Sequence, residues 1–255
     1  MPIPDPTPYV LVLARIAGLV MAAPLLGHLL VPRRARVGLA MVLALALAPS
    51  VAGAMTPASS IAELAGRAAI ETVIGVTIGF VAQLVFAGVQ LGGQMAGIEI
   101  GFGLANLVDP QSNAQSTVIA EWEQLLALLA FLALDAHHLL VAALVESFRI
   151  APIAHGTIDR EVLFAVPSQA AQVFAIGLRI AAPVLIVLLL ANATLGVLQR
   201  TIPQLNVFVV GFPVNVGVGL MVLGASLPFT FRFLAERFAA LGPTIGGLLR
   251  GFAGG

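Results

Sequence analysis

Long apolar runs without charged residues dominate the chain and predict helices that cross a membrane. Several of them exceed the roughly 20 residues that span a bilayer core. Such runs favour helices, because in hydrocarbon each backbone amide must bond within its own segment, and they lack the period-two alternation of a β-barrel. We therefore predict an all-α polytopic membrane protein of helical hairpins and kinked or broken helices, with about six hydropathic segments. The runs are Ile16–Pro32, Val37–Ala62, Thr72–Ile98, Gln124–Leu134 with Ala136–Val145, Val162–Leu178, Ile180–Gln199 and Thr201–Phe231.

The arginines conflict with a simple count of crossings. The positive-inside rule places arginine-rich ends in the cytoplasm, but six crossings would put the two arginine groups on opposite sides. The run Thr201–Phe231 offers a solution, because its prolines favour two short arms or a re-entrant hairpin over one helix. The first group is Arg33, Arg34 and Arg36, the second is Arg232, Arg237 and Arg250, and the prolines are Pro203, Pro213 and Pro228.

Composition excludes several classes of chemistry. Hydrophobic residues make up 60% of the chain and charged residues 9%, against about 25% charged in soluble domains. The net charge is zero, which disfavours nucleic acid as a partner. There is no cysteine and no lysine, so thiolate metal sites, a P-loop lysine and a Schiff base are excluded, and we expect no cofactor. The gaps between apolar runs are too short for a soluble module, so we expect a single membrane domain over residues 1–255.

Glycines form a stripe of small residues in the third run and just after it. Glycines four residues apart let another helix approach closely. The approaching helix can belong to the same chain or to another subunit, and we assign the stripe to subunit packing because a chain of this size has few helices to cover it. The assigned residues are Gly75, Gly79, Gly88, Gly92, Gly93 and Gly97.

The stretch from Gly97 to Pro110 is too broken for a helix and too apolar for a solvent loop. Irregular backbone at membrane depth is tolerated where protein buries it or where it adjoins a water-filled cavity. An ordinary connecting turn is one interpretation. We favour a constriction or plug that lines a pore, formed by Gly101, Phe102, Gly103, Leu104, Leu107, Asp109 and Pro110.

Ionisable residues inside apolar runs are costly and need pairing or water. Arg15 and Glu71 lie near the ends of their segments, so we expect their side chains to snorkel to the interface. Arg179 has long apolar flanks, so we expect it to pair with a carboxylate or to mark a join between two short helices.

Asp135, His137 and His138 lie together but predict no metal site. Adjacent histidines on a helix point about 100° apart, so they do not converge on one ion. We expect a polar interruption or a short turn between two half-helices. Hydrolase signatures such as Gly-x-Ser-x-Gly and His-Glu-x-x-His are absent from the sequence, which argues against an enzyme.

The stretch Asn192–Pro213 resembles the FliR/SctT family of type III protein export gates. The resemblance rests on Arg200, Pro203, Gln204, Asn206, Phe208, Gly211 and Pro213, and it extends to Arg15–Gly18, Ala23–Gly27, Val31–Arg33 and Val108–Pro110. It implies a non-enzymatic gate component in the bacterial inner membrane, at the flagellar basal body. Gly211, Phe212 and Pro213 favour the flagellar branch over the injectisome SctT branch.

Family membership would also supply partners and residue roles. FliR-like proteins assemble with FliP-like and FliQ-like subunits and contact an FlhB-like switch protein, in a helical hetero-oligomer that passes unfolded export substrates. By resemblance, Phe102, Leu104 and Leu107 seal the conduit, while the Pro203 motif makes a structural turn and a subunit contact. The rival interpretation is a small-solute secondary transporter with Arg179 at an anionic substrate.

Overall fold

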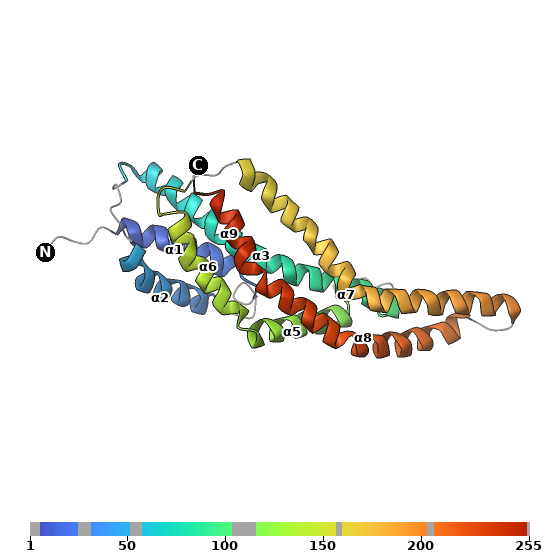
Figure 1. Cartoon of the computed structure of the whole chain (residues 1–255). Coiled ribbons are helices and arrows are strands. Elements are labelled where there is room, and N and C mark those ends of the chain that lie inside the picture. The colour runs from blue at the N-terminus through green and yellow to red at the C-terminus, as the bar shows by residue number, and fades with distance from the viewer. Residues whose placement is uncertain are drawn as a thin grey trace. The chain divides into compact units, whose positions relative to one another are not determined.

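The described part of the chain is built from α-helices (Figure 1). The computed structural model describes residues 6–24, 32–51, 58–103, 116–156, 160–202 and 207–253. Over these ranges the helices and the absence of strands confirm the predicted all-α class. The helices are α1 (Thr7–Ala22), α2 (Arg33–Val51), α3 (Ile61–Ile100), α5 (Val118–Ala133), α6 (Ala136–Ile150), α7 (Arg160–Thr201), α8 (Val207–Ala239) and α9 (Leu241–Arg250).

The chain forms two compact units, each assembled from separate stretches of sequence. Unit 1 comprises Met1–Leu84, Asp135–Ala170 and Phe238–Gly255. Unit 2 comprises Val85–Leu134 and Ala171–Arg237. The long helices α3, α7 and α8 each contribute residues to both units. The single membrane domain over residues 1–255 stays a prediction.

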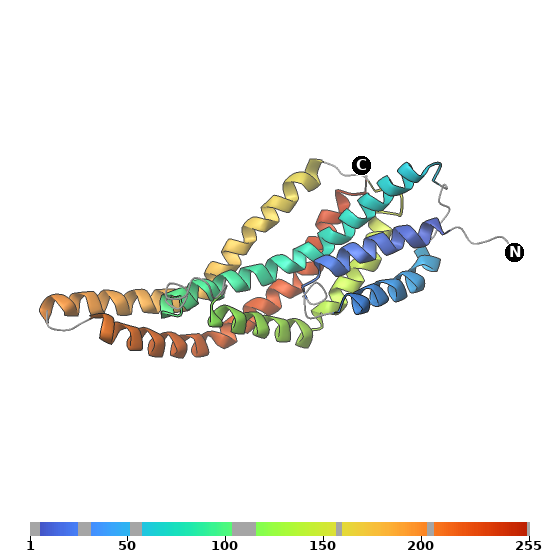
Figure 2. The ribbon, with the colours of Figure 1, turned by 180° about the vertical axis from the view of Figure 1, so that it is seen from behind.

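In unit 1, α1 lies alongside α2 and against the first half of α3, as Figure 2 shows from behind. The side of α1 that faces inward is apolar except for Arg15, with Leu11, Val12 and Ile16 fully buried. Helix α6 packs against α9, whose buried residues are Leu241, Ile245, Leu248 and Leu249. Burial of these side chains, worth about 1.5–3 kcal/mol each for Leu or Ile, holds unit 1 together.

In unit 2, α7 and α8 form a helical hairpin that packs with α5 and the second half of α3 (Figures 1 and 2). One cluster of its hydrophobic core contains Ala96 and Ile100 from α3, Ile119 from α5, Val184 and Leu188 from α7, and Leu223 from α8. Phe86 of α3 also meets Phe131 of α5 edge to face, with ring centroids 5.6 Å apart. Unit 2 therefore has its own core, shared by four helices.

Four of the described helices are long and apolar enough to cross a membrane, and the broken pair α5 and α6 makes a fifth span if it is counted as one. The runs Val162–Leu178 and Ile180–Gln199 belong to one uninterrupted helix, α7. Helices α3 and α7 are each about 60 Å long at 1.5 Å per residue, twice the thickness of the hydrocarbon core. The six segments of the hydropathy pattern therefore do not correspond to six separate spanning helices among the described residues.

The predicted breaks at Pro213 and Pro228 are wrong, because α8 continues through both prolines. Helices in apolar surroundings tolerate proline where nearby hydroxyl groups and local adjustment satisfy the backbone. Near Pro228, the Ser226 Oγ donates to the Leu223 carbonyl oxygen at 2.9 Å, which adds a side-chain bond to the helix backbone at this point. The long apolar run up to Phe231 thus forms the end of α7 and most of α8 instead of a re-entrant hairpin.

The glycine stripe packs against helices of the same chain. A β-carbon on Gly79 would come within 2.7 Å of Ala22 Cβ, and one on Gly93 within 2.6 Å of Ala120 Cα. The structure therefore contradicts the subunit-packing role on these helix faces and supports packing within the chain. The neighbours are Arg15 for Gly75, Ala22 for Gly79, Val173 and Ile176 for Gly88, Gly177 and Ile180 for Gly92, Ala120 for Gly93, and Thr117 for Gly97.

We expect Gly75→Ala to destabilise the protein by about 1–3 kcal/mol, because the new methyl group overlaps the backbone of Arg15 and forces α1 away from α3. Gly66→Ala is the matched control on the same helix. Gly66 has open space where its β-carbon would lie, so alanine there is expected to stabilise by up to about 1 kcal/mol.

The midpoint of thermal unfolding of the full chain in detergent, followed by far-ultraviolet circular dichroism, measures both effects. Equal midpoints for the two variants would contradict the packing described for Gly75.

Candidate functional site

A buried ionic network joins α1, α3 and α6 in unit 1. The Arg15 Nε atom donates to Glu71 Oε2 at 2.6 Å, and the two side chains are 0% and 1% exposed. Arg15 also donates to Ser147 Oγ at 3.0 Å and to the Ala151 carbonyl oxygen at 2.9 Å. The second carboxylate oxygen of Glu71 accepts from the Ala154 backbone N–H at 3.0 Å. The expectation that Arg15 and Glu71 snorkel to the interface is therefore wrong.

The glycines explain why these two charges meet. Gly18 lies three residues after Arg15, and Gly75 lies four residues after Glu71, so each glycine is on the same helix face as its charged residue. A β-carbon on Gly18 would come 2.9 Å from the Val76 nitrogen, which shows how closely the backbones approach. A charged residue one turn from a glycine in an otherwise apolar helix is thus the sequence signal for this pair.

The network fixes the register of three helices. A buried ion pair often adds little net stability over an apolar pair, but loss of one partner leaves an uncompensated buried charge. The Phe148 ring lies 4.3 Å from the Arg15 guanidinium carbon and so adds a cation–π contact. Sliding α1 along α3 would break the ion pair between Arg15 and Glu71, and sliding it along α6 would break the bonds of Arg15 to Ser147 and Ala151.

In unit 2, α3 ends at a glycine that starts the predicted plug. Gly101 has φ +114, and its N–H donates to the Ile98 carbonyl oxygen at 3.0 Å while the Phe102 N–H donates to that of Gly97 at 2.9 Å. This is a Schellman ending, which favours glycine because the left-handed conformation is strained for other residues. Residues 97–100 are helical, so the view that this part is too broken for a helix is wrong.

Only the first part of the predicted plug lies in the described chain. Phe102 is partly buried against the unit 2 core, and Gly103 lies near Ile98. Leu104, Leu107, Asp109 and Pro110 lie outside the described residues.

The start of the predicted plug meets the predicted turn motif. A β-carbon on Gly101 would lie 3.0 Å from the Phe212 ring, and the adjacent Gly211 is buried. Arg200, in the last turn of α7, and Pro213 are exposed. Pro203, Gln204 and Asn206 lie outside the described residues, and of Phe208 only the helical backbone is described. The contact between Gly101 and Phe212 was not predicted, since the two are far apart in sequence.

A partly buried polar pair lies beside this junction. Asn192 Nδ2 of α7 donates to Glu99 Oε1 of α3 at 3.2 Å. Glu99 is two residues before Gly101, so its carboxylate is fixed where the helix ends. An asparagine in a strongly apolar helix was the available signal for this contact.

Glu123 on α5 is a buried carboxyl without such a partner. Its residue is 7% exposed, and its Oε2 atom has no hydrogen-bond partner within the described ranges. The same oxygen lies 3.1 Å from where a β-carbon of Gly93 would be. Nearby, Thr117 caps α5 through the Ala120 N–H at 3.2 Å and donates to the Gly93 carbonyl oxygen at 3.2 Å. This cluster was not predicted, and its signal in the sequence is an acidic residue six positions after the helix cap Thr117.

The predicted separation of His137 from His138 is wrong. The donor atoms of Asp135, His137 and His138 all lie within 4.8 Å of one another, and the two imidazole rings are 4.1 Å apart. Asp135 has φ 53 in the break between α5 and α6, so the regular 100° spacing does not apply to it. The short turn is confirmed. Asp135 and His138 are exposed, and the absence of a bound metal stays a prediction.

Arg179 fits neither expected role. It lies inside the continuous helix α7, and its guanidinium carbon is 5.5 Å from the centre of the Phe233 ring on α8. Arg237 lies 5.0 Å from the same ring. No ion pair of Arg179 occurs among the residues with described positions. A contact with an aromatic face thus replaces the expected carboxylate.

These features define the class: a polytopic all-α membrane protein that uses its few intramembrane polar groups to join its own helices. Comparison with known sequences gives the family. A family model described as "Bacterial export proteins, family 1" matches residues 7–241, and the chain belongs to this family. Proteins of this family are components of the bacterial export apparatus.

Similar proteins carry the name "Flagellar biosynthetic protein FliR". The protein from Escherichia coli K12 is 34% identical over 90% of this chain and 87% of its own length. That from Bacillus subtilis 168 is 32% identical over 94% of each chain, and that from Caulobacter vibrioides is 31% identical over 91% and 92%. The resemblance seen in the sequence motifs is confirmed.

We expect Glu71→Gln to lower the stability by about 3–5 kcal/mol, because the Arg15 charge would remain buried without its counter-charge. Glu123→Gln is the control, since it also neutralises a buried glutamate but breaks no ion pair, and its unfolding temperature should stay the same or rise. The double variant Arg15→Met, Glu71→Leu should recover most of the loss. Thermal unfolding of the full chain in detergent tests all three, and an equal response of the two Gln variants would contradict the network.

Proposed function

We propose that this chain is a non-enzymatic component of the flagellar type III export gate in the bacterial inner membrane. It forms part of the conduit through which unfolded flagellar subunits are exported. The observation that carries the proposal is the similarity to FliR proteins over about nine tenths of the chain, joined to a family match over residues 7–241. The four long apolar helices support a multi-pass position in the membrane.

The partners in this proposal are FliP-like and FliQ-like subunits and an FlhB-like switch protein. Support comes from the unequal burial of the long helices. The most apolar stretch of α3 is 67% buried by the chain itself, whereas that of the α8 segment is only 17% buried. Large apolar side chains such as Phe212, Met221 and Phe229 are exposed on α8. Lipid or neighbouring apolar helices must cover such a surface.

The proposed seal starts at Gly101. Phe102 is held against the unit 2 core, so the chain leaves α3 from a fixed point. We assign Leu104 and Leu107 to the apolar constriction, which keeps the closed conduit free of water and ions. An arriving substrate displaces this segment, and Gly101 and Gly103 absorb the change in backbone conformation. The energy for export comes from other components.

Helices α5 and α6 run back along α3, because Thr117 bonds to Gly93 and the Ala154 N–H bonds to Glu71. If α3 crosses the membrane, the bent pair α5–α6 therefore crosses it in the opposite direction, which gives five crossings with α2, α7 and the α8–α9 segment. An odd number of crossings places the arginines at the start of α2 and at the end of α9 on opposite sides. We assign the start of α2, with its three arginines, to the cytoplasm by the positive-inside rule.

Replacing Leu104 and Leu107 by asparagine should raise ion leakage through the assembled gate several-fold, because polar side chains wet an apolar constriction. The same double change at Leu125 and Leu129 is the control, since these two leucines are exposed on α5, outside the proposed seal. Conductance is measured in cells that express the whole gate, with co-purification showing that each variant assembles. An unchanged leak in an assembled Leu104, Leu107 variant rejects the seal.

A deletion strain distinguishes the proposed role from its rivals. We expect loss of swimming with normal expression of the filament genes, and co-purification of the tagged chain with FliP-like and FliQ-like subunits. Normal motility with loss of effector secretion would instead indicate an injectisome subunit. Solute uptake by vesicles containing this chain alone would indicate a transporter.

A further inference from the structure

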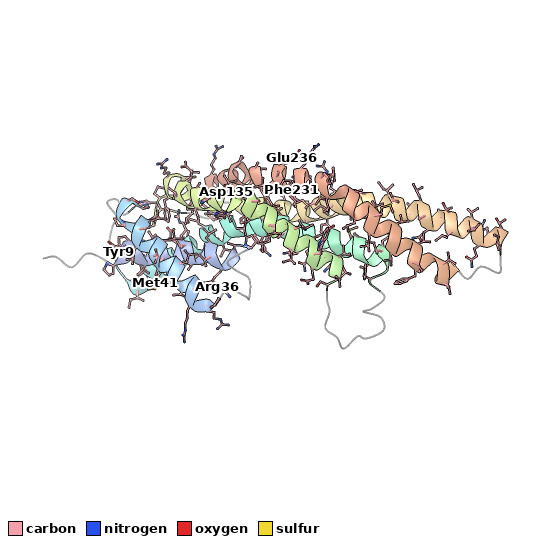
Figure 3. The ribbon with its side chains drawn as sticks, turned by 90° about the horizontal axis from the view of Figure 1, so that it is seen from below. Tyr9, Arg36, Met41, Asp135, Phe231 and Glu236 are labelled. Carbon is pink, nitrogen blue, oxygen red and sulfur yellow. The ribbon has the colours of Figure 1, made fainter. Side chains whose placement is uncertain are left out.

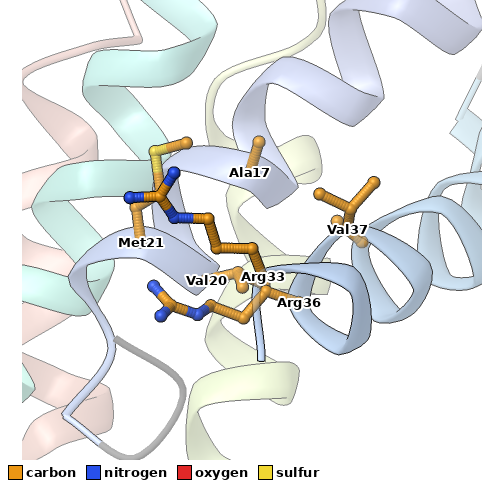
Figure 4. Close-up of a pocket in the computed structure, with 7 residues that line it drawn as sticks. Ala17, Val20, Met21, Arg33, Arg36 and Val37 are labelled. Atoms are coloured by element: carbon orange, nitrogen blue, oxygen red, sulfur yellow. The ribbon is translucent and has the colours of Figure 1, made fainter. Parts of the chain in front are cut away.

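A pocket lies between the C-terminal half of α1 and the N-terminal half of α2, within unit 1 (Figure 4). Its volume is about 230 Å³. Residues from α1 line one side and residues from α2 the other. They are Ala17, Val20 and Met21 from α1, and Arg33, Arg36, Val37 and Ala40 from α2.

The pocket is amphipathic. Its walls are small or aliphatic side chains and one thioether, whereas two guanidinium groups lie at one end. Figure 4 shows the side chains of Arg33 and Arg36 extending in the same direction past Val20 toward Met21. Guanidinium groups present a planar fork of donors that matches the oxygen atoms of a phosphate group.

The charge around this end favours an anion. The first turn of α2 contains Arg33, Arg34 and Arg36 and no acidic residue. Positive side chains at a helix N-terminus oppose the helix dipole, so a negative group beside these arginines lowers their mutual repulsion. The expected ligand therefore carries a negative charge next to an apolar part.

The surroundings identify the apolar part as an acyl chain. The only buried residues of α2 are Ala40, Ala44 and Ala48, and its outer face is apolar. Met41, Val42 and Leu45 are 49%, 64% and 63% exposed, and Figure 3 shows side chains projecting from α2 beside Met41 and Arg36. A face of this kind borders hydrocarbon. The pocket is also smaller than the roughly 300–1,000 Å³ that encloses a drug-sized ligand, so it takes a segment of a chain.

We infer that this groove between α1 and α2 binds an anionic phospholipid of the membrane. The phosphate lies on Arg33 and Arg36, and part of one acyl chain lies along Ala17, Val20, Met21 and Val37. Arginine groups next to membrane helices recognise anionic lipid headgroups in the cytoplasmic leaflet, where the positive-inside rule places this end of α2. The inference does not depend on the proposed gate function, because it needs only a chain that lies in a bilayer.

The test measures lipid binding to the full chain. The protein, stripped of lipid in detergent, is titrated with phosphatidylglycerol or phosphatidylcholine and examined by native mass spectrometry. We expect phosphatidylglycerol to bind more tightly. Arg33→Gln with Arg36→Gln should weaken that binding about tenfold or more, because both guanidinium groups that hold the phosphate are removed.

Two further sets of variants separate the groove from general surface charge. Arg34→Gln is the matched control, because this neighbouring arginine does not line the pocket, and it should leave binding nearly unchanged. Ala17→Phe fills the groove but keeps both arginines, so it should also weaken binding. Met21→Ser removes apolar contact with the acyl chain. Because Met21 is 71% exposed, this variant is expected to fold, and it replaces Ala17→Phe in the test if that variant does not fold.

Three results would overturn the inference. Equal affinity for the two lipids removes the role of the negative charge. Equal losses from Arg34→Gln and from the Arg33, Arg36 variant show attraction to surface charge only. Competition by glycerol phosphate at the concentration at which phosphatidylglycerol binds shows a headgroup site without an acyl chain.

Discussion

The ion pair between Arg15 and Glu71 is the interaction on which the arrangement of unit 1 depends. Neither side chain reaches water, so each charge is tolerable only while the other is in place. They meet because Gly18 and Gly75 let the backbones of α1 and α3 come into contact. Ser147 and the Ala151 carbonyl group then bring α6 to the same point. Close packing and charge pairing therefore require each other, and neither alone specifies the register of these helices.

In unit 2, the helices are held in register without a buried ion pair among the residues whose positions are described. Gly93 and Gly97 on α3 accept the close approach of Thr117 and Ala120, so α5 begins directly on the surface of α3. A single hydroxyl group, that of Thr117, both caps α5 and bonds to the α3 backbone. This fixes the last turns of α3, and Gly101 then directs the chain out of the helix. The start of the proposed seal is thus positioned by close packing at Gly93 and Gly97 and by one hydroxyl group.

The sequence predicted the helices and the close-packing glycines because both leave a local pattern. It did not predict which helix each glycine contacts. Pairs such as Arg15 with Glu71, and Gly101 with Phe212, are brought together only by the tertiary fold. The predictions for the prolines of α8 and for Arg179 were wrong for a related reason, because the effect of these residues depends on the surroundings of the helix. Proline breaks a helix in water, but in apolar surroundings a continuous helix keeps more backbone groups bonded, and α8 continues through Pro213 and Pro228. Arg179 likewise stays inside a continuous helix, because the Phe233 ring contacts its guanidinium group.

Helices of the same chain cover the glycine stripe of α3, so other subunits must bind a different surface. A neighbouring helix needs an apolar face with small residues that nothing yet covers. Helix α8 offers one, because Gly217 and Gly224 have open space where a side chain would begin, and they are seven residues apart, hence on one face. Exposed Leu220 and Met221 lie between them. In the gate that we propose, α3 therefore organises the chain internally, and the outer face of the α7–α8 hairpin is what remains for its partners.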